Sequence, residues 1–526
     1  MNIAAGRVSA ILGASEAPTG ALDHRALMPF ASFTLRRRGA APFRSLALPA
    51  IATILAATAA VCGAGAAILA AAGQDHAVTY MLAVLQTALV AWLGAVSWTA
   101  QRTWARAGVI TALAWIPTFL ISSWIYAFNP SLLDVGPPNA AIATVDLSLV
   151  CFIAGYAWLL RGTGVNPDEP AGEAAPSCVQ VQEVTLSRRW VLTWITLGCL
   201  GFGVIFALTG GPIHFIRDVS NEGSLTRGRT YFIAAALALT FIAQVAACAQ
   251  WARGAALSPR LIAGLAGTVV LAATLGSRQL VAVPVVELVL YYALVRGRVR
   301  VRVGLPLLLA GAVVIIVGIG MVKRYGNYVQ AHPGTHIGRL EFLVTKGPGD
   351  FMSSYASNSA DGVRLIALGE RTVPRFAPPE YGKEALRLLL QPLPSGIRPK
   401  VSTAPAIQAA IYPSPVLSYA QPLQLMSYLQ FLYPGVVVAF LILGAATAKL
   451  EQALASARAY RPSTLLALVA LAVQVTTVLR SASAGAVAVA LIEVVGLWTV
   501  ARTTERLGED PSPLPRASAY TSAAAL

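Results

Sequence analysis

Charged side chains are scarce in this sequence. They make up 12% of its 526 residues, roughly half the share that soluble globular proteins carry. Hydrophobic residues reach 56%, and the mean hydropathy is +0.66. This composition excludes an ordinary soluble protein and indicates a chain that spends most of its length in a membrane.

Cysteine and histidine are also rare, with five of each. No cysteine falls in a segment that we expect outside the cell membrane, which argues against a disulfide framework and a cysteine zinc site. Those outer segments also lack a Walker loop, a dinucleotide fingerprint and an Asp-x-Asp pair. We therefore expect no metal site and no other cofactor.

Basic residues outnumber acidic ones by 39 to 23, giving a net charge of +16. They are scattered through short connections between apolar runs rather than gathered on one face, so we expect no nucleic-acid partner. Retention of positive loops on the cytoplasmic side of a membrane explains them better.

Apolar runs of membrane-spanning length recur along the chain. They predict an all-α polytopic membrane protein with about twelve transmembrane helices, at 46–72, 77–98, 107–128, 139–160, 190–209, 230–250, 261–277, 279–295, 303–322, 426–448, 463–479 and 484–501.

The connections between these helices predict the orientation. With the N-terminus inside, most short basic loops fall in the cytoplasm, as the positive-inside rule requires. The chain then divides into a cytoplasmic basic tail, nine helices, a large extracytoplasmic loop, three more helices and a cytoplasmic tail, at 1–45, 46–322, 323–425, 426–502 and 503–526. We expect a multi-pass protein of the cytoplasmic membrane with both termini inside.

Several arginines break the positive-inside rule because they fall in short outer connections. They are Arg217, Arg227, Arg229, Arg278 and Arg480. They either reach lipid headgroup phosphates or serve a site on the outer face. Clustered arginines suit a phosphate or pyrophosphate ligand, and a lipid-linked pyrophosphate would lie at this interface.

The long outer loop carries eleven basic and six acidic residues and ten prolines between Pro374 and Pro422. Loops of this length usually carry function. We expect a cap over a cavity at the outer helix ends, with short surface helices near Gly338–Lys346 and Glu380–Gln391.

Short motifs in these positions resemble the O-antigen (Wzy-type) polymerases, the oligosaccharide repeat-unit polymerases. The matching segments are Gly276-Ser277-Arg278, the basic loop 210–229, Lys323-Arg324-Tyr325, Pro394–Lys400, Tyr428–Gly435 and Leu479-Arg480-Ser481. Gln430 stands where the family usually has Asn, and Met426 stands where it has an acid.

The resemblance implies a GT-C-like fold and metal-independent glycosyl transfer between repeat units on undecaprenyl diphosphate, at the outer face of the membrane. Candidate catalytic residues are Arg278, Glu341, Asp350 and His336. Candidate substrate-binding residues are Arg217, Arg227, Arg229, Arg324, Arg398, Lys400, Tyr428 and Arg480. The expected partners are the lipid-linked oligosaccharide and membrane lipids, with a chain-length regulator as a further candidate.

Two other functions stay open. An O-antigen-ligase-like enzyme would transfer the glycan to a different acceptor, and the loop histidines His332 and His336 would then matter more. A flippase for lipid-linked glycans would use acids inside the spans, where Asp146, Glu287 and Glu493 lie.

Overall fold

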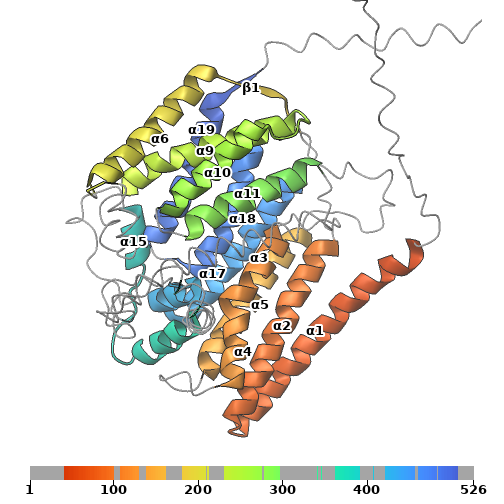
Figure 1. Ribbon diagram of the computed structural model, residues 1–526. Coiled ribbons are helices and arrows are strands. Elements are labelled where there is room, and N and C mark those ends of the chain that lie inside the picture. Colours follow the sequence, from red (N-terminus) through yellow and green to blue (C-terminus); the bar gives the residue numbers. More distant parts are fainter. Residues whose placement is uncertain are drawn as a thin grey trace, which may run out of the picture. The chain divides into compact units, whose positions relative to one another are not determined.

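The computed structural model describes residues 41–99, 107–129, 138–161, 181–208, 210–211, 230–274, 278–296, 341, 345, 362–390, 407, 421–455, 460–482 and 484–507. The chain divides into two units, Met1–Ala47 and Leu48–Leu526. One helix begins at Ala41 in the first unit and continues into the second, and all other described elements belong to the second unit (Figure 1).

Helices make up almost all of the described chain. The elements are α1 (Ala41–Ala71), α2 (Asp75–Thr99), α3 (Ala107–Trp115), η1 (Ile116–Leu120), α4 (Ile121–Phe128), α5 (Asn139–Arg161), β1 (Val184–Leu186), α6 (Arg188–Leu208), α9 (Thr230–Ala252), α10 (Pro259–Thr274), α11 (Arg278–Arg296), α15 (Lys383–Leu389), α17 (Leu423–Ala455), α18 (Pro462–Arg480), α19 (Ala484–Thr504) and β2 (Glu505–Leu507).

The expectation of an all-α polytopic membrane protein is confirmed. Among the described residues, nine helices are long and apolar enough to cross a membrane. Continuous apolar runs dictate this result, because a helix satisfies its own backbone hydrogen bonds in lipid. The predicted span 303–322 lies outside the described residues, and the total of twelve spans stays a prediction.

The buried side chains form two clusters. The first joins α1–α5 to α17 and centres on aromatic rings, with the Trp115 ring 5.2 Å from Phe119 and 6.1 Å from Phe440. The second joins α6, α9, α10, α11, α18 and α19. α17 contributes to both clusters, through Phe440 to the first and Leu450 to the second.

Glycines let α5 and α17 pack backbone to backbone. A Cβ atom at Gly155 would collide with the Leu441 carbonyl, and one at Gly444 would collide with the Phe152 carbonyl. Small residues at such crossings are the usual means of bringing membrane helices together. These contacts fix the position of α17, which carries part of the candidate site.

The bundle has two distinguishable ends. At one, which we call the strand end, β1 pairs with β2, and the Ser463 hydroxyl at the start of α18 donates to the Glu505 carboxylate at 2.6 Å. At the other, the loop end, α2 and α5 begin side by side, and the Asn139 amide donates to the Asp75 carboxylate at 3.1 Å. Residues 362–390 belong to the long loop, and the start of this segment packs into the first cluster through Val363, Leu365 and Ile366.

Candidate functional site

α17 is two helices joined by a sharp reversal. Phe431 and Leu432 leave the helical conformation, Leu432 with a φ of 57°, and Pro434 follows them without a backbone donor. A Cβ atom at Gly435 would collide with the Ser427 carbonyl. Ser427 and Gly435 are eight residues apart and would be separated by about 12 Å along a continuous helix. Their close contact means that the chain turns back on itself between them.

The long loop caps the end of the first helix of α17. The last carbonyl groups of that helix have no hydrogen-bond partner within the helix. The Leu429 carbonyl accepts a hydrogen bond from the Glu380 N–H at 2.9 Å, and the Gln430 carbonyl accepts one from the Tyr381 N–H at 3.0 Å. The Gln430 amide also donates to the Glu380 carboxylate at 2.7 Å. These bonds hold the loop against the reversal.

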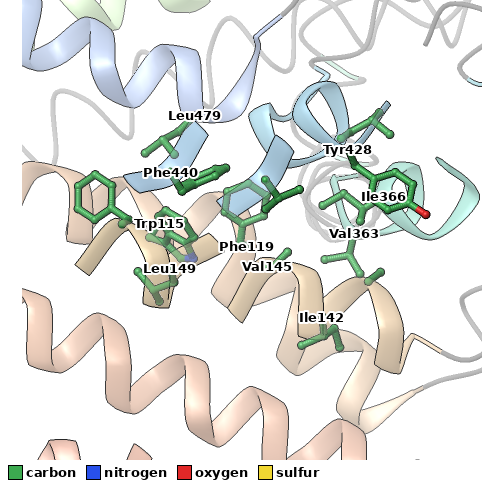
Figure 2. Packing of buried hydrophobic residues seen from close by; sticks show 14 of the residues in the cluster. Trp115, Phe119, Ile142, Val145, Leu149, Val363, Ile366, Tyr428, Phe440 and Leu479 are labelled. Atoms are coloured by element: carbon green, nitrogen blue, oxygen red, sulfur yellow. The ribbon is translucent and has the colours of Figure 1, made fainter. Parts of the chain in front are cut away.

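A helical segment of the loop, residues 362–372, enters the core of the bundle. Its Val363 and Ile366 side chains are fully buried and lie beside Tyr428 in Figure 2. The Cβ position of Gly362 is 3.6 Å from the Thr118 carbonyl. Thr118 lies midway along the candidate span Ala107–Phe128. The segment therefore reaches about halfway from the loop end toward the strand end.

The start of α17 lies at a similar depth. The Gln424 amide donates to the Ser148 hydroxyl at 3.2 Å, and Ser148 is nine residues along α5 from Asn139, or about 13 Å. The Gln421 carbonyl accepts a hydrogen bond from the Ala482 N–H, just past α18, at 2.8 Å. Helical segments that end inside a membrane bundle are tolerated only where protein or a water-filled cavity surrounds them.

Glu370, on the inserted loop segment, contacts both α5 and α17. Its Oε1 accepts hydrogen bonds from the Thr144 hydroxyl on α5 and from the Tyr433 hydroxyl, at 3.5 Å, just past the reversal in α17. Its Oε2 is buried and has no hydrogen-bond partner within the described part of the chain. Burial raises the pKa of the Glu370 carboxyl, and the two hydroxyl donors offset only part of that rise.

Two tyrosines of α17, Tyr428 and Tyr433, lie next to Glu370 or to the loop segment that carries it. Their rings meet edge to face, with centroids 5.1 Å apart. Tyr428 is 4% exposed, and its hydroxyl donates to the Val373 carbonyl at 3.0 Å, so it anchors the loop segment. Tyr433 is 44% exposed and is the one that can face a ligand.

Arginines flank Glu370 in the sequence of the loop, and a further arginine ends α18. Arg371 and Arg375 are exposed, and Arg364 is half-buried in the inserted helix. Arg480 is exposed at the end of α18, two residues before the N–H that binds Gln421. A half-buried acid with a raised pKa is suited to proton transfer, and arginines in the same loop segment are suited to binding an anion.

The structure places some of the residues predicted from the sequence. Arg480 is the last residue of α18, Tyr428 contacts the loop segment at Val373, and Glu341 is exposed in a helical turn with Thr345. Arg278 is the first residue of α11, and only its backbone is described. The remaining candidates lie outside the described residues: Arg217, Arg227, Arg229, Arg324, His332, His336, Asp350, Arg398 and Lys400.

Sequence reasoning did not single out Glu370, Arg364, Arg371 or Arg375. The signal was present, because Glu370 interrupts an apolar helical run in a loop otherwise broken by proline. Its contact with Thr144 could not be foreseen, because it depends on how the loop folds back into the bundle.

Most acids inside the bundle have fixed partners. The Gln244 amide donates to Glu287 at 2.8 Å, and the Gln474 amide donates to Glu493. Glu451 accepts a hydrogen bond from the Tyr156 hydroxyl at 2.5 Å. Within the described residues, no group of three or more His, Cys, Asp or Glu side chains is arranged to hold a metal ion.

No protein-family model, curated protein or solved structure matches the chain.

Proposed function

We propose that this protein is a membrane glycosyltransferase that polymerises oligosaccharide repeat units carried on undecaprenyl diphosphate. The observation that carries the proposal is Glu370, a half-buried acid with a raised pKa that a loop segment places between α5 and α17. The same stretch of the loop also carries the exposed Arg371 and Arg375.

The charges of the two ends support a location at the outer face of the cytoplasmic membrane. Basic residues cluster at the strand end, at or next to the ends of helices and in β2: Arg188, Arg189, Arg253, Arg260, Arg296, Arg502 and Arg506. Lys and Arg in short loops are retained in the cytoplasm. The strand end is then cytoplasmic, and the loop end faces outward, where the lipid carrier presents its finished repeat unit.

The proposed reaction is a displacement at the anomeric carbon of the growing chain. A sugar hydroxyl of the incoming unit forms the new C–O bond while the bond from that carbon to the carrier diphosphate breaks. Glu370 takes the hydroxyl proton as general base. Its raised pKa makes Glu370 a stronger base than an exposed carboxylate.

The departing diphosphate gains negative charge and needs cations. Arg371, Arg375 and Arg480 are the described candidates at the loop end. Arginine forks bind phosphate oxygens in pairs and stay charged at any physiological pH. Preorganised positive charge at the leaving group stabilises the transition state without a metal.

Two of the three acids that a flippase would use weigh against it. A transporter uses such acids as mobile carriers of protons or ions, whereas Glu287 and Glu493 accept hydrogen bonds from Gln244 and Gln474 on neighbouring helices. Asp146, the third, has no hydrogen-bond partner within the described residues. The ligase-like reaction would use the same Glu370 chemistry and differ only in its acceptor.

Purified protein in lipid nanodiscs, supplied with a lipid-linked repeat unit, tests the proposal. Wild-type protein should build a ladder of longer glycans, and Glu370→Gln should slow elongation by about 100-fold or more. Glu183→Gln, at an exposed acid of the strand end, is the matched control and should elongate normally. Equal rates for Glu370→Gln and wild type would refute the assignment.

A further inference from the structure

A second group of buried polar side chains lies between α2, α4 and α5, apart from Glu370. Gln86 is 0% exposed, Asp146 is 3% exposed and Ser123 is 0% exposed. Neither oxygen of Asp146, neither amide atom of Gln86 and not the Ser123 hydroxyl has a hydrogen-bond partner within the described chain. Buried polar atoms without partners are rare and require an explanation.

Gln86 and Asp146 lie at the same level of the neighbouring helices α2 and α5. The Thr79 hydroxyl on α2 donates to the Asn139 side chain on α5. Gln86 is seven residues beyond Thr79, and Asp146 is seven residues beyond Asn139, so each lies two turns further on the same helix face. Ser97 on α2 bonds the Tyr156 hydroxyl at 3.1 Å, which confirms that the two helices run alongside each other past this point.

Ser123 comes to the same level from α4. The indole N–H of the adjacent Trp124 donates to the Thr87 hydroxyl at 3.1 Å, and Thr87 follows Gln86 directly. The three side chains thus offer one carboxylate, one amide oxygen and one hydroxyl at one level of the bundle, about 10 Å beyond the contact of Thr79 with Asn139.

Apolar residues close this group off above and below. Ala83 and Ile142 are fully buried one turn toward the loop end, and Leu149 is fully buried one turn toward the strand end. A lone carboxylate in such surroundings is strongly destabilised unless a positive charge or a proton compensates it. Oxygen ligands with a single negative charge neutralise a hard monovalent cation and leave a divalent cation with excess charge.

We propose that Asp146, Gln86 and Ser123 form a sodium-binding site between α2, α4 and α5. Carboxylate, amide and hydroxyl oxygens are ligands for sodium, and bound sodium balances the charge of Asp146 inside the bundle. The site is separate from the proposed glycosyl transfer and does not depend on it.

Thermal unfolding of the purified full-length protein in detergent tests the site, with NaCl replacing choline chloride at constant ionic strength. A ligand that binds only the folded state raises the Tm as its concentration rises. We expect a saturable increase with sodium and a smaller one with potassium. Binding of ²²Na⁺ to the same sample should saturate at one ion per chain.

Asp146→Asn should abolish both signals. Gln86→Leu keeps the Asp146 carboxylate and should weaken sodium binding by about 10-fold or more. This variant tests the site if Asp146→Asn fails to fold. Glu493→Gln, another intramembrane acid but one that Gln474 already binds, is the control and should respond like wild type. Equal Tm values in sodium and choline, or a full sodium response in Asp146→Asn, would overturn the proposal. A Tm that follows pH but not sodium would assign the site to a proton instead.

Discussion

The hydroxyl of Thr144 on α5 donates a hydrogen bond to the carboxylate of Glu370, which a loop helix carries into the bundle. This contact joins a membrane-spanning helix to a segment more than two hundred residues later in the chain. It holds the proposed base in a half-buried position, where desolvation raises its pKa and where the Tyr433 hydroxyl on α17 also reaches it at 3.5 Å.

The rate of elongation should depend on pH through Glu370. A general base works as the carboxylate, so activity should rise as the pH passes upward through the raised pKa of Glu370. Thr144→Val removes a donor that stabilises the charged form, and the pKa should rise further. The acid limb of the rate profile should therefore move to higher pH, as initial rates in nanodiscs would show. A limb that stays in place would mean that Glu370 is not the titrating base.

Tyr433→Phe provides the companion test. It removes the second hydroxyl donor to Glu370 but keeps the ring beside Tyr428. We expect a smaller shift in the same direction, because the bond is longer than that from Thr144. A loss of activity with no change in the pH profile would indicate instead that Tyr433 binds the sugar.

The reversal in α17 should be sensitive to side-chain volume. Gly435→Ala places a methyl group against the Ser427 carbonyl and should destabilise the protein by about 1–3 kcal/mol. Unfolding in denaturant after purification measures this. Gly203→Ala is the control, since a Cβ atom there meets no neighbour within 4 Å; similar losses in both variants would contradict the proposed close contact.

The buried pair of Gln474 and Glu493 should contribute to stability through one hydrogen bond between α18 and α19. Gln474→Leu leaves the acid without its donor and should cost about 1 kcal/mol, the scale measured for such bonds in membranes. The double variant Gln474→Leu/Glu493→Leu should recover most of that loss. A double variant as unstable as the sum of its single variants would show that the two side chains are not coupled.

The orientation predicts which residues an impermeant thiol reagent can reach. In a variant without the five native cysteines, Arg375→Cys at the loop end should react in intact cells. Arg506→Cys at the strand end should react only after the membrane is opened. The reverse pattern would place the proposed site in the cytoplasm, where the finished lipid-linked unit is not available.

Hydropathy predicts much of the bundle but little of the site. The runs 77–98 and 139–160 became α2 and α5 with ends within a few residues, because long apolar stretches have no other stable form in lipid. The run 426–448 was expected as one helix, and the structure instead has a break at Phe431–Leu432 inside α17. Pro434 and Gly435 marked that break locally, but its reversal depends on contact with the loop.

The short loop helices were predicted only in part. Lys383–Leu389 forms α15 within the expected range 380–391, and its Leu386 side chain is exposed. Nothing in the local pattern indicated that residues 362–372 would insert beside Phe119. The insertion depends on tertiary packing, because Val363, Leu365 and Ile366 are buried in the same cluster as residues of α5 and α17.

The size distribution of cell-surface and lipid-linked glycans tests the central claim most directly, in a host whose only copy of the gene encodes Glu370→Gln. We expect long polymer to collapse to single repeat units on the carrier at the outer face, as in a deletion strain, although the variant protein reaches the membrane at normal levels. Polymer of normal length would contradict the role of Glu370, and repeat units trapped at the cytoplasmic face would contradict polymerisation and indicate a flippase.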